Sequence, residues 1–284
     1  MHTSECNMVP GTEGTSKKMK GKFPVPSVPG TILKVLTLNT WQECGPWEQR
    51  WEIIFQGLET YQPDLVGFQE VFNPDWAEAV MKRSKFPHLV FSSDPSGLMI
   101  LSKFPVCQWS SYTMKTKSLT ENYKRYALFA ELEVGKNRFA VFNTHLSWRL
   151  EEGKIREGQV DELLAFINDK APSAETLVMG DFNSTCKTSE VRGMPDKGGF
   201  VDSFAALHPE APGLTWDNRN PFAAGSSHPL PDRRIDYIFF RNASALLPGL
   251  VASDIVFDQP NREGVFASDH YGLLNTFKSK TGEL

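Results

Sequence analysis

Apolar runs end in polar, chemically capable residues at six places along this 284-residue sequence. The endings share asparagine, glutamate, histidine and aspartate, and they are Asn39, Gln69-Glu70, Asn143-Thr-His145, Gly180-Asp-Phe-Asn183, Ile235-Asp236 and Ser268-Asp-His270. A single such residue after a strand is usually part of a turn or caps a helix. Six endings built from so few residue types favour one shared site instead, because strand ends at one edge of a sheet lie close together.

Three of these residues have side chains that suit a divalent cation. The carboxylates of Glu70 and Asp269 are hard oxygen ligands of the kind that Mg²⁺ prefers, and Asn39 is grouped with them. Mg²⁺ typically keeps several waters and takes one or two protein carboxylates together with substrate phosphate. We therefore expect Glu70, Asn39 and Asp269 to hold Mg²⁺ or Mn²⁺.

The remaining polar endings supply groups for the attack of water at phosphorus. Asp181 is placed to orient or deprotonate a water, and Asn183 can donate to a phosphate oxygen without adding negative charge. His145 and His270 can donate to oxygens on which charge builds in the transition state. Asp236 is expected to hold His270 in one orientation and to favour its protonated form. With a metal, these groups predict in-line displacement at phosphorus.

The segments between these residues have the patterns of a mixed α/β protein. Helical spacing of apolar residues predicts three helices, at 46–61, from Asn73 or Asp75 to about 85, and at 151–169. Short apolar or alternating runs predict strands at 31–38, 65–68, 97–102, 106–112, 126–134, 138–143, 176–179, 234–240, 250–257 and 271–277. Two pairs are expected to lie side by side: 97–102 with 106–112, and 126–134 with 138–143 as a hairpin about Gly135.

Mixed strands with helices outside them indicate two packed sheets in a single domain, from about residue 31 to 284. Residues 1–30 are rich in Ser, Thr, Gly, Pro and Lys without periodicity, so we expect a flexible leader that activity does not need. Residues 208–232 are rich in Pro, Gly, Asn and Ser and predict a long loop of the kind usually kept for function.

The net charge of −4 disfavours nonspecific binding of long nucleic-acid duplexes as the main activity, since contacts to many phosphates usually require an excess of basic residues. Local basic stretches occur at 17–22, interpreted as a solvated tail, and at 115–125. No apolar run approaches the roughly 20 residues that span a bilayer, and residues 1–30 lack the apolar stretch that would predict a cleavable signal. Four cysteines lie far apart, which disfavours zinc and indicates reduced thiols. We expect a cytoplasmic monomer.

In this order and spacing, the six endings resemble the motif set of the endonuclease/exonuclease/phosphatase superfamily, over about residues 31–278. The resemblance implies a four-layer αββα sandwich of two mixed sheets flanked by helices. It also implies a divalent metal held mainly by Glu70 and one-step hydrolysis of a phosphoester by activated water. A catalytically silent binding scaffold is the alternative outside the enzymes, and it is disfavoured because no motif residue is missing.

The branch of the family is less well defined. His145 disfavours enzymes that resemble exonuclease III, which typically place a tyrosine in this region. The C-terminal third resembles tyrosyl-DNA phosphodiesterase 2, although Phe182 and Tyr237 depart from that pattern. Gly-Asp-Phe-Asn and Arg-Ile-Asp-Tyr are also similar to neutral sphingomyelinases. Three substrate classes stay open: nucleic-acid ends, including 5′-tyrosyl-DNA, lipid headgroups and small phosphodiesters.

Aromatic and basic residues near the motifs are candidates for substrate binding. Trp216 can stack on a base or another substrate ring, or close the long loop by packing. Trp41 and Trp148 follow motif residues and either line the site or pack. Arg149 can bind a second phosphate or the leaving group. Arg156 is expected to be a partnered arginine on the surface of its helix.

Overall fold

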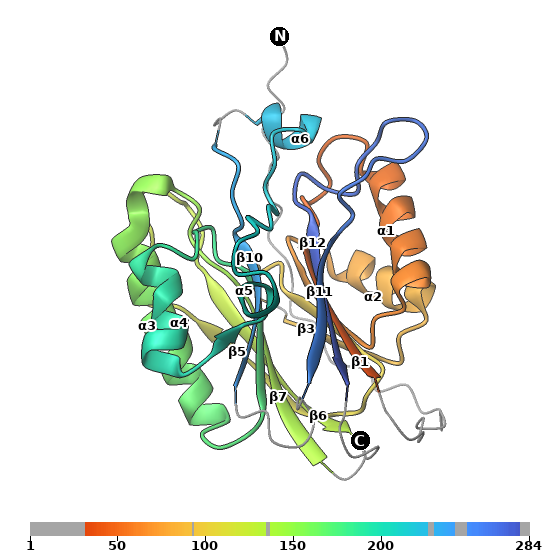
Figure 1. The fold of residues 1–284 in the computed structure, drawn as a ribbon. Helices are drawn as coiled ribbons and strands as arrows, with labels where there is room; N and C mark the ends of the chain where they lie inside the picture. Colours follow the sequence, from red (N-terminus) through yellow and green to blue (C-terminus); the bar gives the residue numbers. More distant parts are fainter. Residues whose placement is uncertain (1–31, 93, 135–136, 227–229, 242–248, 279–284) are drawn as a thin grey trace.

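The computed structural model describes residues 32–92, 94–134, 137–226, 230–241 and 249–278, so the expected leader at 1–30 lies outside the described residues. Two six-stranded sheets lie face to face, with helices on their outer faces (Figure 1). This is the four-layer αββα sandwich that the motif resemblance implied, and that prediction is confirmed.

The first sheet has the strand order β11-β12-β1-β2-β4-β3. Its strands are β1 (Ile32–Asn39), β2 (Leu65–Gln69), β3 (His88–Phe91), β4 (Met99–Ser102), β11 (Leu250–Val256) and β12 (Gly272–Lys278). The central strand β1 runs parallel to β2, with Asn39 opposite Gln69, and antiparallel to β12, with Thr37 opposite Leu273. Asn39, Glu70 and the residues that precede β12 therefore share one edge.

The second sheet has the order β5-β6-β7-β8-β10-β9. Its strands are β5 (Val106–Thr113), β6 (Tyr126–Val134), β7 (Asn137–His145), β8 (Thr176–Asp181), β9 (Val201–Asp202) and β10 (Asp236–Arg241). His145 lies opposite Asp181 in the parallel pair β7 and β8, and Asp181 lies opposite Asp236 in the antiparallel pair β8 and β10. The register thus places three of the predicted site residues in one row.

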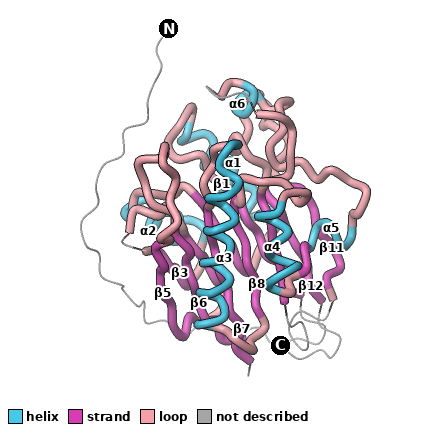
Figure 2. Tube along the Cα trace, turned by 90° about the vertical axis from the view of Figure 1, so that its left-hand side faces the viewer, coloured by secondary structure: helices cyan, strands magenta, loops and turns pink. Residues whose placement is uncertain are grey.

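Helices cover the outer face of each sheet. The longer ones are α1 (Trp47–Tyr61), α2 (Pro74–Ser84), α3 (Gly153–Lys170) and α4 (Ser189–Gly198), and the short ones are the 3-10 turn Leu150–Glu152, α5 (Ser203–Leu207) and α6 (Pro221–Ala224). In Figure 1, α1 and α2 lie outside the first sheet, and α3 and α4 lie outside the second. Figure 2 shows α3 and α4 side by side across that outer face.

Alternation along the strands divides the apolar residues between three layers of core. On β7, Phe139 and Val141 face the other sheet, whereas Ala140 and Phe142 face α3. The same division fills the space under α1 and α2 with apolar side chains from β1, β2 and β4. Each fully buried apolar side chain contributes about 1.5–3 kcal/mol relative to an exposed one, so these layers hold the strand ends in place.

One predicted pairing is wrong: β4 and β5 are not neighbours. Both sides of β4 are taken, because β2 and β3 pair with it, and β5 pairs with β6 in the other sheet. The chain crosses between the sheets through a short turn in which Ser102 Oγ accepts a hydrogen bond from Phe104 N at 2.9 Å. The hairpin of β6 and β7 is confirmed.

Five helical or strand elements have weak sequence patterns and were not expected: β3, β9, α4, α5 and α6. Helix α4 contains Gly193, Pro195 and Gly198, which are poor helix residues. It forms because Val191 and Met194 pack into the core under it, and because Gly193 lets it approach α3, where an added Cβ would lie 3.1 Å from Val160. Helix α6 lies within the segment that was expected to be a long loop.

Candidate active site

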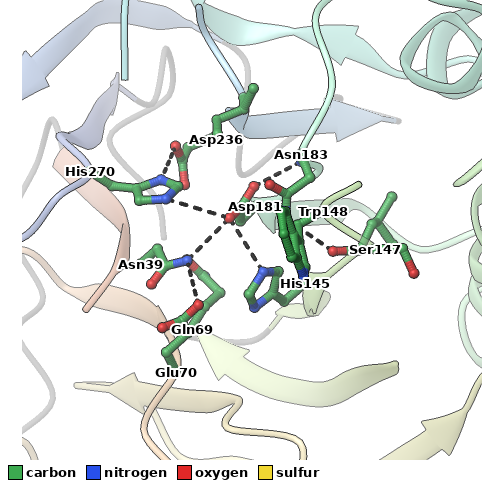
Figure 3. Close-up of polar contacts among 12 residues, drawn as sticks. Asn39, Gln69, Glu70, His145, Ser147, Trp148, Asp181, Asn183, Asp236 and His270 are labelled. Atoms are coloured by element: carbon green, nitrogen blue, oxygen red, sulfur yellow. Dashed lines mark hydrogen bonds and ion pairs between the residues drawn. The ribbon is translucent and has the colours of Figure 1, made fainter. Parts of the chain in front are cut away.

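Strand direction explains why distant residues meet at one edge of the sandwich. Asn39, His145 and Asp181 end parallel strands, whereas Asp236 begins β10, which runs in the opposite direction. His270 lies two residues before β12, which is antiparallel to β1. All of these positions therefore fall at the same edge, and their side chains converge (Figure 3).

Asp181 is at the centre of this group and is 1% exposed. Its Oδ2 lies 3.1 Å from Asn39 Nδ2, 3.4 Å from His145 Nε2 and 3.9 Å from His270 Nε2. Its Oδ1 accepts a hydrogen bond from Asn183 N at 2.8 Å. One carboxylate thus contacts four of the residues that the sequence singled out (Figure 3).

Burial raises the pKa of the Asp181 carboxyl, and the negative charge of Asp236 raises it further. The charge of His270 and hydrogen bonds from Asn183 and Asn39 act in the opposite direction, and the pKa is about 7. A carboxylate with a pKa near neutrality is suited to accept a proton at physiological pH.

The two imidazoles differ in charge. Burial alone would lower the pKa of His270, but the charge and hydrogen bond of Asp236 raise it, with smaller contributions from Asp181 and Asp269, to about 10. His270 is therefore protonated at neutral pH. His145 has the opposite outcome, because burial, with the charges of Arg125 and His270, lowers its pKa well below the usual value and keeps the ring neutral.

Asp236 and Trp216 fix the ring of His270. Asp236 Oδ2 lies 3.0 Å from His270 Nδ1, and Asp236 N donates to Thr215 Oγ1 at 3.1 Å. The ring of Trp216 meets His270 edge-on, with 5.1 Å between ring centroids. These contacts direct His270 Nε2 toward Asp181.

Glu70 follows β2 and takes the left-handed backbone region, with φ of 65°. Its Oε1 lies 3.3 Å from Asn39 Nδ2, while Asn39 Oδ1 accepts a hydrogen bond from Trp41 N at 3.0 Å. The amide nitrogen of Asn39, and not its oxygen, therefore faces the carboxylates of Glu70 and Asp181. Non-glycine residues with positive φ are costly and cluster at functional sites.

Asp269 lies beside Glu70 at the same edge. Burial is the largest cause that raises the pKa of Asp269, the charge of His270 lowers it and the charge of Glu70 raises it, and the resulting pKa is about 6. Ser268 Oγ lies 3.2 Å from Asp269 Oδ1 and 2.7 Å from Asn39 O, which ties this segment to the end of β1. Two neighbouring carboxylates whose charges oppose each other fit a divalent cation, which would offset both.

A second group of potential ligands is less suited to a cation. Asp181, Asp236 and His270 each offer one ligand atom, and these atoms lie within 4.8 Å of one another. His270 Nδ1 and Asp236 Oδ2 already contact each other, and His270 carries a positive charge. A cation bound by this group would have to compete with the contact between His270 and Asp236.

The predicted substrate-binding residues differ in the side chains that they contact. Trp216 lies against His270 and is 6% exposed. Trp41 packs against the ring of Phe222, with 4.9 Å between ring centroids, and lies under the guanidinium of Arg50. The Arg149 guanidinium lies 4.2 Å from the ring centre of Trp148, and its Nε is buried without a hydrogen-bond partner among the described residues.

Two buried arginines support the loops of the site. Arg50 was not among the residues predicted from the sequence, and it donates to the backbone carbonyls of Thr40, Trp41, Gln42, Cys44 and Ala267. Arg156 is 3% exposed and pairs with Glu190 at 3.2 Å. The expectation of a surface position for Arg156 was wrong, because Arg156 also donates to carbonyls of the loop after His145.

A model of the Endonuclease/Exonuclease/phosphatase family matches residues 37–270. The chain belongs to this family. The expected family and its αββα fold are confirmed. Among the described residues, every helix is too short or too polar to pass through a bilayer.

The chain is similar to several known proteins. Tyrosyl-DNA phosphodiesterase 2 of Xenopus laevis is 28% identical over 251 residues, which are 85% of this chain and 66% of that protein, slightly less than two thirds of its length. The structure titled D. rerio TDP2 complexed with single strand DNA product has a TM-score of 0.73 at 21% identity, with 87% of this chain and 99% of that one covered. Sphingomyelinase C from Streptomyces griseocarneus has a TM-score of 0.70 at 21% identity, with the same coverage. At these identities the two structures support the fold alone.

Proposed function

We propose that this protein is a Mg²⁺- or Mn²⁺-dependent phosphodiesterase that hydrolyses its substrate in one step with an activated water. The position of Asp181 carries the proposal, because one buried carboxylate contacts two imidazoles and two asparagines at the edge where the strands end. Family membership supports the reaction class.

We propose that Glu70 and Asp269 hold the cation, with Asn39 as a neighbour that donates to Glu70 and Asp181. This differs from the expectation of a third ligand at Asn39, because its amide oxygen is engaged by Trp41 N. The bound cation would neutralise charge on the phosphate oxygens and polarise the group for attack.

Asp181 is proposed to orient the attacking water and accept its proton. Asn183 N holds Oδ1 of this carboxylate, which leaves Oδ2 directed toward the imidazoles. The Asn183 side chain donates to Leu146 O at 3.0 Å, so its amide fixes the loop after β7. A pKa of about 7 allows Asp181 to take a proton near neutral pH.

The two histidines are proposed to stabilise charge on the phosphoryl oxygens. His270 is protonated and held by Asp236, so its Nε2 can donate to an oxygen that becomes more negative in the transition state. His145 is neutral and contacts Asp181 through Nε2. A protonated and a neutral imidazole therefore lie on either side of one carboxylate, and both can stabilise the charge that develops on the phosphoryl oxygens.

For the substrate, we propose nucleic-acid ends first. The chain is 28% identical to a tyrosyl-DNA phosphodiesterase 2 over 85% of its length, and the ring of Trp216 lies next to His270. We propose a reducing, cytoplasmic setting, because Cys107 and Cys186 are exposed thiols.

Hydrolysis assays test this proposal. The wild-type protein should hydrolyse bis-p-nitrophenyl phosphate with Mg²⁺ or Mn²⁺, and a chelator should abolish turnover. Among 5′-tyrosyl-DNA, single-stranded DNA, RNA, sphingomyelin and phosphomonoesters, a nucleic-acid substrate should give the highest kcat/KM. Failure to hydrolyse any phosphoester with either metal would favour a silent binding scaffold, and a preference for sphingomyelin would overturn the substrate class.

A further inference from the structure

Arg233 is a buried arginine in which two guanidinium nitrogens have no hydrogen-bond partner among the described residues. It is 5% exposed, and its Nε and Nη2 make no hydrogen bond to any residue that the structure describes. Its neighbour Arg234 shows the usual alternative, since both terminal nitrogens of Arg234 donate to the carboxylate of Asp202, at 2.9 and 2.8 Å. Buried guanidinium nitrogens without hydrogen-bond partners are costly and persist only where something else requires them.

The other buried arginines of the described ranges all have partners. Arg125 pairs with Glu121, Arg156 pairs with Glu190, and Arg50 donates to five backbone carbonyls. Arg233 therefore stands apart from them, and packing of the fold does not account for its charge.

The backbone directs Arg233 toward the site. Trp216 and Arg233 form an isolated antiparallel bridge, with Trp216 N donating to Arg233 O and Arg233 N donating to Trp216 O, both at 2.9 Å. Directly opposed residues of an antiparallel pair place their side chains on the same face. The ring of Trp216 contacts His270, so Arg233 shares the face that is turned to the candidate active site.

The charges around Arg233 agree with this placement. Burial lowers the pKa of its guanidinium, and the negative charges of Asp181 and Asp236 act in the opposite direction. On the other side of the group, the charges of Asp269 and Glu70 act on Arg50. The two buried arginines therefore flank the centre, one near the proposed metal ligands and one near the proposed base.

Trp216 adds a second unused donor. Its Nε1 is buried and has no hydrogen-bond partner within the described part of the chain. Two side chains of one bridge thus present unused N–H groups near the ring of His270. Several donors with net positive charge suit an anion whose oxygens accept hydrogen bonds, and a phosphate group has this chemistry.

We propose that Arg233, together with Trp216 Nε1, binds an anionic oxygen of the substrate's phosphate group on the Asp181 side of the site. This inference rests on the proposed phosphodiesterase function and assigns to Arg233 the role of a substrate-binding cation supplied by the chain itself. The bound phosphate provides a partner for guanidinium nitrogens that have none among the described residues.

Thermal unfolding with inorganic phosphate, in the presence of a chelator, tests the inference without catalysis. Arg233→Met keeps the length of the side chain and removes its charge. In phosphate-free buffer this variant should unfold at the same temperature as the wild type or higher, because the Nε and Nη2 groups that it removes are buried without hydrogen-bond partners among the described residues. Phosphate should raise the Tm of the wild type, and Arg233→Met should lose that rise. Trp216→Phe should reduce the rise in part.

Arg219→Gln is the matched control, because Arg219 lies on the same loop, pairs with Asp217 and has a side chain that is 83% exposed. It should keep the phosphate-induced rise. On bis-p-nitrophenyl phosphate with Mn²⁺, Arg233→Met should lower kcat/KM by about 10- to 100-fold, which corresponds to one charge-assisted hydrogen bond. Arg233→Lys should recover part of this loss.

The outcomes separate this inference from the proposed function. A phosphate-induced rise that is absent in the wild type, or equal in Arg233→Met, overturns the inference even where turnover is normal. Destabilisation of Arg233→Met with an unchanged phosphate effect indicates a structural role and also overturns it. A phosphate effect that depends on Arg233 in a protein without any turnover supports the binding site while the proposed function fails.

Discussion

His270 Nδ1 lies 3.0 Å from Asp236 Oδ2, and this contact joins the two sheets of the sandwich. Asp236 begins β10 in the second sheet, whereas His270 precedes β12 in the first. Asn39 and Asp181 make a second contact of this kind at 3.1 Å. The site is therefore built across the interface of the sheets, and each half is incomplete alone.

Replacement of Asp236 tests the first of these contacts. Asp236→Asn removes the charge that keeps His270 protonated, so kcat on bis-p-nitrophenyl phosphate should fall by about 10²- to 10⁴-fold, with a smaller change in KM. Asp254→Asn, on the exposed side of β11, is the control and should behave as the wild type. An unchanged kcat for Asp236→Asn would contradict the role assigned to this pair.

Gly180 positions Asp181 through its backbone. Its φ is 141°, and an added Cβ would lie 2.0 Å from Thr144 O on the adjacent strand. Gly180→Ala should therefore cost more than about 3 kcal/mol of unfolding free energy, measured by denaturant titration, or prevent folding. Gly199 also has positive φ but has open space around it, so Gly199→Ala should cost only about 1 kcal/mol. Equal losses at both positions would show that the close approach at Gly180 is unimportant.

The pair of Arg156 and Glu190 predicts a pH dependence of stability. Burial raises the pKa of Glu190, but hydrogen bonds from Ser184 and the backbone and the charge of Arg156 outweigh it, so the pKa lies below the usual 4.5. A group whose pKa is depressed on folding stabilises the protein above its unfolded pKa and loses this effect as the pH falls. Glu190→Gln should be about 3 kcal/mol less stable than the wild type at pH 7.

This difference should shrink as the pH falls below 4.5, where the wild-type carboxyl also becomes protonated. Glu210→Gln, at an exposed position, should follow the wild type throughout. Urea unfolding at a series of pH values measures the effect. A difference between Glu190→Gln and the wild type that stays constant into acid would contradict the assignment.

The hydrogen bonds of Arg50 predict that this residue stabilises the segments that carry the proposed metal ligands. It joins the loop after β1 to the segment before β12, and it is fully buried. Arg50→Met leaves the carbonyls of that loop without donors and should cost about 3–5 kcal/mol of stability. Arg50→Lys should keep the charge and recover part of the loss. A fully stable Arg50→Met protein would contradict the role of Arg50 as the clamp between these segments.

The sequence predicted that the polar strand ends converge, because the signals for these ends are local. Asp181, His145 and His270 each follow or precede an apolar run, and parallel and antiparallel directions then bring such ends to one edge. Arg233 lies in none of the six endings, and Gly180 lies in one of them without a predicted role, because the roles of these residues arise from a cross-strand bridge and from a carbonyl on another strand.

The orientation of the Asn39 amide and the sheet to which each strand belongs could also not be predicted from the sequence. Asn39 was grouped with the metal ligands, but the direction of its amide depends on the backbone of Trp41, which folds back to donate to it. The separation of β4 from β5 depends on β3, a strand of four residues with little pattern of its own. Which strand pairs with a free edge depends on all the strands of the sheet, and a local sequence pattern does not reveal it.

The turnover of Asp181→Asn tests the central claim most directly. In this variant the group keeps its shape but cannot accept a proton from water. With Mn²⁺ and bis-p-nitrophenyl phosphate, its kcat should fall by about 10³-fold or more relative to the wild type, while Asp196→Asn on the exposed surface of α4 keeps full activity. A kcat for Asp181→Asn within a few-fold of the wild type would contradict the account.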